Sequence, residues 1–470
     1  MWDKEDYIMV VQHNMQAANA NRMLNVTTSA QSKSTEKLSS GYRINRAADD
    51  AAGLTISEKM RKQIRGLDQA STNAQDGVSS VQTAEGALTE VHSMLQRMNE
   101  LATQAANGTN SKDSDRQAIQ DEIDQLTTEI DRVSETTKFN ETYLLKGEDG
   151  TKTINMKAHD AGLKGKLTDN GDGTATFVMD TLNAGDKVSI GGKSYTIGSD
   201  DAEVEKWFTD NGNDVKDEAT KKVTVNGTEY TYYAAKAANT TAGSLTDGWD
   251  AGWYASAPTD KGDGTGTALS GKFANVDAIK AEVKKGATVQ NGTKSVTGMN
   301  DTTPKDGVSD TDATVISKNK AYELASKELL KANQIGDTEG NAQVGTGADV
   351  DVAVDLTHGD GTFSIKVGQA KVANSLAFSL HVGADADMTN KIQVNIDAMD
   401  SASLGIKGLN VKDDSGNAAT YAVDAISDAI SKVSSQRSAL GAVQNRLEHT
   451  INNLDNVVEN TTTAESRIRD

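Results

Sequence analysis

The sequence predicts an α+β fold: a discontinuous long-helix bundle, a coiled-coil-like rod built from both chain ends, with a β-rich central insert. Apolar side chains recur at alternating steps of three and four over residues 54–105 and 423–468, which is coiled-coil spacing. Between these stretches, short alternating runs are separated by turns rich in Gly, Asp and Thr, as strands and hairpins are. We expect four parts, namely residues 1–50, 51–147, 148–375 and 376–470.

The N-terminal part, over residues 9–50, is rich in Asn, Gln, Ala, Ser and Thr and has few apolar anchors. Such a segment forms only a weak helix alone, because it has little apolar surface to bury. We expect it to order against copies of itself or against a partner.

The sequence of residues 51–147, the N-terminal part of the rod, predicts two antiparallel helices. Its seven-residue repeat has one register slip, between Val81 and Ala84, and Asn107-Gly108 should end the helix. Ser114, with Gln117 three residues on, resembles a capping box. The second helix places its apolar residues on one stripe, and the short link makes the pair antiparallel. These stripe residues are Ile119, Ile123, Leu126, Ile130 and Val133.

The central part predicts hairpins and two short helices. Hairpins are expected at 167–174, 187–196 and 222–231, and the first turn recurs loosely at 356–362. Helices are expected over 276–285, behind Asn275 as a cap, and over 312–333. The tryptophans here are interpreted as a small-domain core rather than as a ligand platform. They are Trp207, Trp249 and Trp253.

The C-terminal part begins with strands over 376–382 and 392–396, which should form a hairpin against the bundle. A third helical stripe then runs from Ile426 to Ile468, interrupted by polar Arg437, Thr461 and Glu465. No single stripe can bury itself, so the three stripes should form one bundle that joins the chain ends. This design fits a subunit built to assemble, although periodicity alone also fits an ordinary helical bundle.

Composition and missing motifs exclude several functions. The chain has 68 Asp+Glu against 48 Lys+Arg, which argues against nucleic acid as a partner. No apolar stretch is long enough for a membrane span, and residues 1–8 are too acidic for a cleaved secretory signal. Cysteine, H-E-x-x-H, Walker-type and G-x-S-x-G motifs are absent. The Asp-Gly turns are interpreted as structural rather than calcium-binding, so we expect no enzyme, no metal and no cofactor.

Sequence blocks at both ends resemble those of bacterial flagellins. The longest is residues 38–54, which read LSSGYRINRAADDAAGL. The resemblance covers about 9–147 and 376–470, and the central part carries no family signal. The shorter blocks are QDGVS at 75–79, TAEGAL at 83–88, LQRMNELA at 95–102 and SALGAVQNRL at 438–447.

The resemblance implies a structural subunit that polymerises into the flagellar filament for motility. It implies a helical homo-oligomer outside the cell, exported without a cleaved signal through the flagellar secretion apparatus with an export chaperone. Residues 1–50 would be the assembly segment of an inner tube, the rod an outer tube, and the insert a surface antigen. The implied assembly residues are Leu38, Gly41, Arg43, Asn45, Asp49 and Asp50.

The resemblance also implies a host partner, the innate immune receptor Toll-like receptor 5. An exposed Arg would make forked hydrogen bonds to the receptor and a neighbouring Leu would fill an apolar pocket. Without the resemblance, Arg97 would be interpreted as part of a solvated helix face. The implied contacts are Gln96, Arg97, Leu101 and Glu122.

The chain departs from the family pattern at both ends. Eight residues precede the usual start, and the family's C-terminal helix has no counterpart after Asp470. We therefore expect this chain to polymerise poorly while receptor binding through the bundle survives. The alternatives are a hook–filament junction protein, a flagellin with an adhesive insert and a flagellin with an enzymatic insert.

Overall fold

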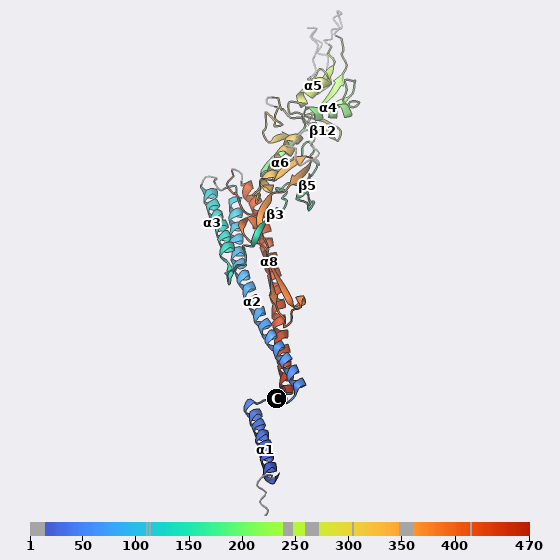
Figure 1. Ribbon diagram of the computed structural model, residues 1–470. Coiled ribbons are helices and arrows are strands. Elements are labelled where there is room, and N and C mark those ends of the chain that lie inside the picture. Colours follow the sequence, from blue (N-terminus) through green and yellow to red (C-terminus); the bar gives the residue numbers. More distant parts are fainter. Residues whose placement is uncertain are drawn as a thin grey trace, which may run out of the picture.

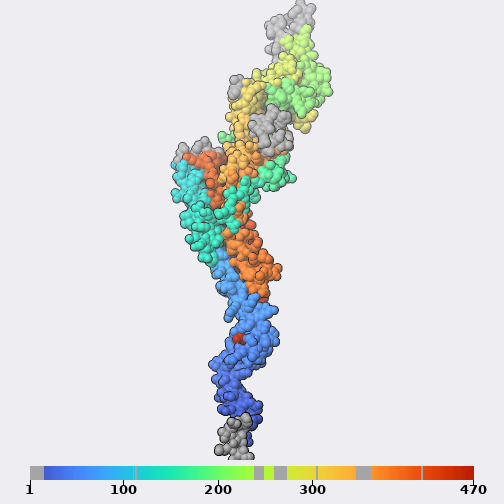
Figure 2. Space-filling view, viewed as in Figure 1, coloured from blue at the N-terminus to red at the C-terminus, as the bar shows by residue number. Residues whose placement is uncertain are grey.

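Long helices from the two ends of the chain lie side by side in the computed structural model (Figure 1). The structure describes residues 15–109, 111, 114–237, 248–258, 272–302, 305–346, 361–413 and 416–470. The rod consists of α2 (Ala51–Ala105), α3 (Asp115–Thr136) and α8 (Asn417–Arg469). In the space-filling view, the N-terminal segment (blue) lies at one end of an elongated molecule and the insert (green and yellow) at the other (Figure 2).

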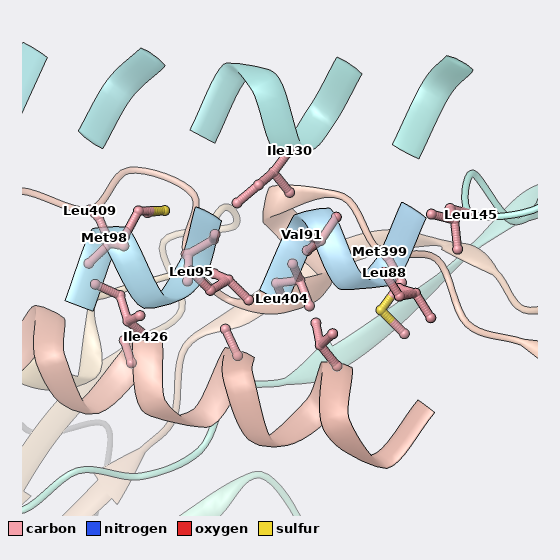
Figure 3. Packing of buried hydrophobic residues seen from close by; sticks show 14 of the residues in the cluster. Leu88, Val91, Leu95, Met98, Ile130, Leu145, Met399, Leu404, Leu409 and Ile426 are labelled. Atoms are coloured by element: carbon pink, nitrogen blue, oxygen red, sulfur yellow. The ribbon is translucent and has the colours of Figure 1, made fainter. Parts of the chain in front are cut away.

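The rod core is built from the predicted heptad positions. Leu88, Val91, Leu95 and Met98 of α2 are 0 % exposed. Figure 3 shows these side chains between Ile130 of α3 and Ile426 of α8, with Leu404 and Leu409 packed alongside. Non-polar area removed from water in this way is the main stabilising contribution to a fold. The predicted fold class, with a rod made from both chain ends, is confirmed.

The ends of α2 and α3 differ from the prediction. Gly108 is not among the glycines with positive φ, so α2 does not end on a left-handed glycine. Instead, buried Arg116 donates to the carbonyls of Ala105 (2.9 Å) and Asn107 (3.3 Å), which satisfies groups left over at the helix end. Ser114 does precede α3, but its side chain makes no capping bond, so the predicted capping box is wrong.

The predicted hairpin against the rod is confirmed. It consists of β17 (Leu376–His381) and β18 (Lys391–Ile396), which pair antiparallel; η2 (Met388–Asn390) precedes β18. Asn73 Nδ2 donates to the carbonyl of His381 at 2.9 Å. The hairpin approaches α2 so closely at Gly77 that a Cβ there would lie 2.2 Å from Leu380 Cδ1.

The insert is joined to the rod by a two-stranded antiparallel ladder of β3 (Glu148–Asn155) and β16 (Gln369–Asn374). Just before the ladder lies the small pair β1 (Lys138–Phe139) and β2 (Thr142–Tyr143). The short helix α7 (Ser401–Leu404) packs against the ladder, where Ala402 lies beside Ala370 and Val372. The first and last strands of the insert are therefore neighbours.

Beyond the ladder, the insert contains two hydrophobic clusters. The first, around Phe177, Tyr322 and Phe363, is buried between two sheets and α6. The sheet orders are β14-β15-β5-β4 and β13-β7-β6. The elements are β4 (Gly165–Asp169), β5 (Thr174–Met179), β6 (Lys187–Ile190), β7 (Lys193–Gly198), β13 (Val315–Ser317), α6 (Lys318–Asn333), β14 (Gln343–Thr346) and β15 (Thr362–Lys366).

The second cluster surrounds Trp253 and Ile279. Trp253 is 0 % exposed and Trp207 packs against this cluster, whereas Trp249 lies outside it with Lys236 Nζ 4.8 Å from its ring centroid. The sheet order is β10-β9-β8-β11-β12. The elements are α4 (Asp201–Asp210), β8 (Lys222–Val225), β9 (Thr228–Tyr233), β10 (Gly252–Tyr254), α5 (Val276–Val283), β11 (Thr288–Asn291) and β12 (Lys294–Thr297).

The three predicted hairpins of the insert are present as β4–β5, β6–β7 and β8–β9. The Asn275 side chain caps α5 as expected. The helix predicted over 312–333 begins only at Lys318, because Ser317 caps it and residues 315–317 pair in parallel with β7. Of the loose repeat at 356–362, residues 356–360 lie outside the described residues.

Helix α1 (Met15–Ser40) buries none of its residues. Met15, Leu24 and Leu38 are all more than half exposed. This exposure is consistent with a segment that has few apolar anchors, and the expectation that it orders only against copies of itself or a partner stays a prediction. Residues 9–14 of the segment lie outside the described part. Within the described residues, no helix is long and apolar enough to cross a membrane.

Candidate functional site: two surfaces of the rod

The first surface is the junction (residues 41–50), which connects α1 to α2 and holds the end of α8. The backbone N–H of Arg43 donates to the carbonyl of Arg469 at 2.8 Å, and Arg43 Nη2 donates to the carbonyl of Ile468 at 2.8 Å. The last carbonyls of a helix lack partners within the helix. The junction supplies these partners and so ties the beginning of the chain to α8.

Tyr42 strengthens this connection. The guanidinium of Arg469 lies 4.7 Å from its ring centroid and that of Arg61 lies 5.6 Å away. Both arginines approach Glu465, with Arg61 at 3.3 Å and Arg469 at 3.9 Å. Cations near an aromatic face and near a carboxylate are both favourable, more so when partly desolvated.

Glu465 is the buried centre of this group, at 8 % exposed. It accepts a hydrogen bond of 2.6 Å from the hydroxyl of Ser57 on α2. We did not predict Tyr42, Ser57, Arg61 or Glu465 as site residues from the sequence. A signal was present, because Glu465 interrupts an apolar stripe and a buried carboxylate requires a partner.

Two aspartates organise the end of the junction. Asp50 Oδ1 accepts from the backbone N–H groups of Ala52 (3.1 Å) and Gly53 (2.9 Å) and so caps α2. Asp49 Oδ2 accepts from the N–H groups of Arg46 (3.1 Å) and Asn45 (3.2 Å). These bonds favour the carboxylate and hold the pKa of Asp49 below its ordinary value.

The structure brings five of the six predicted assembly residues together in the junction: Gly41, Arg43, Asn45, Asp49 and Asp50. Gly41 follows α1 with φ +76°, which few side chains tolerate, and Asn45 Nδ2 donates to Ser40 Oγ at 2.8 Å. Leu38 lies apart on α1, where it is 86 % exposed. The junction fixes the direction of the backbone between α1 and α2, whereas the apolar side chain of Leu38 is exposed on α1.

The second surface lies on α2 and α3 around Arg97. Its Nε donates to Glu122 Oε1 at 2.9 Å and its Nη1 to Glu100 Oε2 at 3.2 Å. These two carboxylates, Glu122 first, raise the pKa of Arg97. The Arg97 side chain is nevertheless 50 % exposed, so the guanidinium is oriented by the rod and accessible from outside.

The other two predicted contacts differ from one another. Gln96 is exposed, and its Nε2 lies 3.1 Å from His92 Nε2. Leu101 is 2 % exposed and belongs to the rod core. The expectation that Leu101 fills a pocket on a partner is therefore corrected, because its side chain already packs inside the rod. Arg97, Gln96 and Glu122 remain available on the surface.

Neither surface resembles a catalytic or metal centre. Within the described residues, no group of three or more His, Cys, Asp or Glu is placed to hold a metal ion. Both surfaces consist of oriented charges and hydrogen-bonding groups on long helices. Such surfaces are suited to contacts between proteins.

Comparisons with known proteins agree at both ends of the chain. Residues 11–149 match the bacterial flagellin N-terminal helical region and residues 423–470 match the bacterial flagellin C-terminal helical region. A flagellin of Clostridium tyrobutyricum is 34 % identical over 98 % of this chain and 92 % of its own length. Flagellin C of Vibrio anguillarum is 32 % identical over 98 % of this chain and 89 % of its own length.

Other matches are more local or weaker. The flagellin of Bacillus subtilis (strain 168) is 60 % identical over 30 % of this chain and 46 % of its own length. Among solved structures, FliC from Burkholderia pseudomallei is 19 % identical, covering 79 % of this chain and 99 % of that chain with a TM-score of 0.25. So low a score supports no conclusion about this chain.

The two family regions contain α1, α2, α3 and most of α8, and the alignments with the near full-length relatives run through the insert between them. Flagellins are structural proteins that polymerise into the extracellular flagellar filament. The chain belongs to the bacterial flagellin family and is a filament subunit.

Proposed function

We propose that this filament subunit is also a ligand of Toll-like receptor 5, recognised on the α2–α3 surface through Gln96, Arg97 and Glu122. The observation that carries the proposal is the half-exposed guanidinium of Arg97, held by Glu122 and Glu100. An oriented Arg loses less side-chain entropy on binding than a free one, and its remaining N–H groups can donate to a partner. Leu101 would support this surface from beneath, through packing in the core.

The test is the binding of the full chain to the isolated receptor ectodomain, measured by surface plasmon resonance. Arg97→Ala should weaken binding by about 1–3 kcal/mol, the range expected for an important interface Arg. Glu122→Gln should weaken it less, because an amide oxygen can still accept from Arg97.

The matched control is Arg132→Ala. Arg132 is also an exposed rod arginine paired with a glutamate, Glu129, on its own helix. This variant should bind as the unaltered chain does. Equal binding by the Arg97→Ala chain and the unaltered chain would discard the proposed surface.

We also infer that residues 1–50 form the assembly segment and that the junction orients it for polymerisation. Support comes from the exposed apolar side chains of α1 and from the ties between the junction and α8. In this division, 51–147 and 376–470 form the rod, while 148–375 projects outward as a surface antigen. Export without a cleaved signal, with a chaperone and the flagellar secretion apparatus, belongs to the same proposal.

Assembly can be tested separately from receptor binding. Leu38→Ala should reduce the length and number of filaments seen by electron microscopy after the subunit is expressed in a bacterium lacking its own flagellin. Met388→Ala is the control, since Met388 is also a well-exposed apolar residue, at 72 %, but lies on the rod hairpin. If both variants form filaments equally well, Leu38 has no role in assembly.

A further inference from the structure

A cavity of about 390 Å³ lies where the insert joins the rod. Its walls come from residues 154–159 at the end of the ladder, from α7, and from residues 425–435 of α8. Figure 1 shows β3 beside α8 in this region. Ile154, Met156 and Leu404 provide apolar wall, and Lys432 provides a cationic group. Asn155, Asp428, Ser431 and Ser435 are among the other polar lining residues. A cavity between two parts of a protein that combines apolar wall with placed polar groups is a common form of small-molecule site.

Lys432 has fewer partners than its ammonium can use. Its Nζ donates to the carbonyl of Ser403 at 2.5 Å, and it forms no other hydrogen bond or ion pair with the described residues. An ammonium has three N–H donors. The side chain is partly buried, and burial is the first cause that lowers the pKa of Lys432. A partly buried cation with unused donors favours a nearby anion.

The carboxylates whose charge reaches Lys432 are engaged elsewhere. Asp397 accepts from Ser375 Oγ at 2.5 Å and lies 3.5 Å from Lys152 Nζ. Asp400 accepts from the backbone N–H of Ser403 at 3.3 Å and so caps α7. Neither is within ion-pair distance of Lys432, so the protein provides only distant compensation for its charge.

The other ionisable groups of the cavity lie close to one another. Lys157 Nζ lies 2.8 Å from Asp428 Oδ1, and His159 Nε2 lies 3.8 Å from Asp428 Oδ2. Ser403 is 3 % exposed, and its hydroxyl has no hydrogen-bond partner among the described residues. A buried polar group without a partner is uncommon in proteins. Ser403 and Lys432 therefore lie on the same wall of the cavity, and each has a hydrogen-bonding group that the described residues do not fully satisfy.

We propose that this cavity between the ladder and α8 binds a small organic anion, namely a carboxylate on a short apolar chain. The carboxylate receives hydrogen bonds from Lys432, and the chain lies against Ile154, Met156 and Leu404. Because the walls belong to both the ladder and α8, the bound molecule connects the insert to the rod. This site is separate from the α2–α3 surface and from the junction.

Isothermal titration calorimetry of the full chain with hexanoate tests the proposal, with hexanamide as the uncharged probe of equal length. Hexanoate should bind at one molecule per chain, and hexanamide about tenfold more weakly or not at all, because it lacks the charge-assisted bond. Lys432→Gln should lower the affinity for hexanoate by about tenfold, and Lys432→Arg should retain most of it.

The matched control is Lys407→Gln, which removes an exposed lysine that is not part of the cavity wall and should leave hexanoate binding unchanged. Circular dichroism shows whether the Lys432→Gln chain is folded. Three results would overturn the proposal: no saturable binding of hexanoate, equal binding of hexanoate and hexanamide, or unchanged hexanoate affinity in the folded Lys432→Gln chain.

Discussion

Gly53 lies in the first turn of α2, where the junction folds back onto the helix. A Cβ at this position would lie 2.5 Å from Asp50 Oδ2 and 2.8 Å from Ile44 Cδ1. A side chain at position 53 would therefore clash both with Asp50, which caps α2, and with the buried side chain of Ile44. This is a packing requirement, since Gly53 does not have a positive φ.

We predict that Gly53→Ala lowers the free energy of unfolding by about 1–2 kcal/mol, the usual value of a helix cap. Urea denaturation followed by circular dichroism measures the change. Gly86→Ala is the control in the same helix, because a Cβ at Gly86 meets nothing within 4 Å. That substitution should stabilise α2 by about 0.5–1 kcal/mol. Equal effects at the two glycines would contradict the packing at Gly53.

Arg116 connects three helices at the end of the rod that faces the insert. It is 2 % exposed and donates to the end of α2 and to the carbonyl of Asp413, just before α8, at 2.8 Å. At the C-terminus of a helix its positive charge is also favourable. Three helix ends thus depend on one side chain of α3.

At this scale of elements, we predict that Arg116→Ala destabilises the rod by about 3 kcal/mol, because it leaves buried carbonyls without a donor. The midpoint of urea denaturation reports the change. Arg132→Ala, at an exposed site on the same helix, should cost less than about 0.5 kcal/mol. A loss at Arg116 as small as that at Arg132 would show that water replaces the guanidinium without cost.

The sequence was most informative where periodicity runs for many residues. The heptads of α2 and α8 predicted the buried residues Leu95 and Val433 because an element of that length has one apolar face. It was least informative where two segments distant in the sequence determine the outcome. Residues 315–317 form a strand because β7 lies beside them, and nothing local indicates that neighbour.

The same limit applies to the candidate site. Residues such as Arg43 and Asp50 were identified by resemblance, and the capping role of Asp50 was found only in the structure. The partners of Arg43 lie at the far end of the chain, at Ile468 and Arg469. Leu101 was also named as a contact by resemblance, and its exposure is not given by the sequence. Only packing against the rest of the rod decides that it is buried.

For the whole molecule, the ladder of β3 and β16 makes the insert separable from the rod. The N–H of Met156 donates to the carbonyl of Gly368 at 2.8 Å, so the chain enters and leaves the insert at adjacent points. The rod core consists almost entirely of residues 81–145 and 376–440. Tyr421 of α8 does not pack in this rod core. Its side chain packs in the first hydrophobic cluster of the insert, and its hydroxyl donates to Glu328 Oε2 at 2.7 Å.

We predict that replacing residues 157–367 by a short Gly-containing turn leaves a folded helical rod. The helical circular dichroism signal per molecule should be retained, less the contribution of α4, α5 and α6. Its melting temperature should fall, because Tyr421 loses its partners. The same deletion carrying Leu95→Asp is the control and should unfold, since it buries an unpaired charge. Loss of the helical signal in the first variant would mean that the insert is required for the rod to fold.

The central structural claim is that α2 and α8, from opposite ends of the chain, pack as one rod. Ser71 Oγ donates to Asp455 Oδ1 at 3.1 Å across this interface, and the chain contains no cysteine. The most direct measurement is therefore disulfide formation in the double variant Ser71→Cys with Asp455→Cys, detected by gel mobility with and without reductant. We expect rapid intramolecular cross-linking in this pair and none in the control pair Ser71→Cys with Ser431→Cys. Absence of the cross-link in the first pair, or equal cross-linking in both, would contradict this packing.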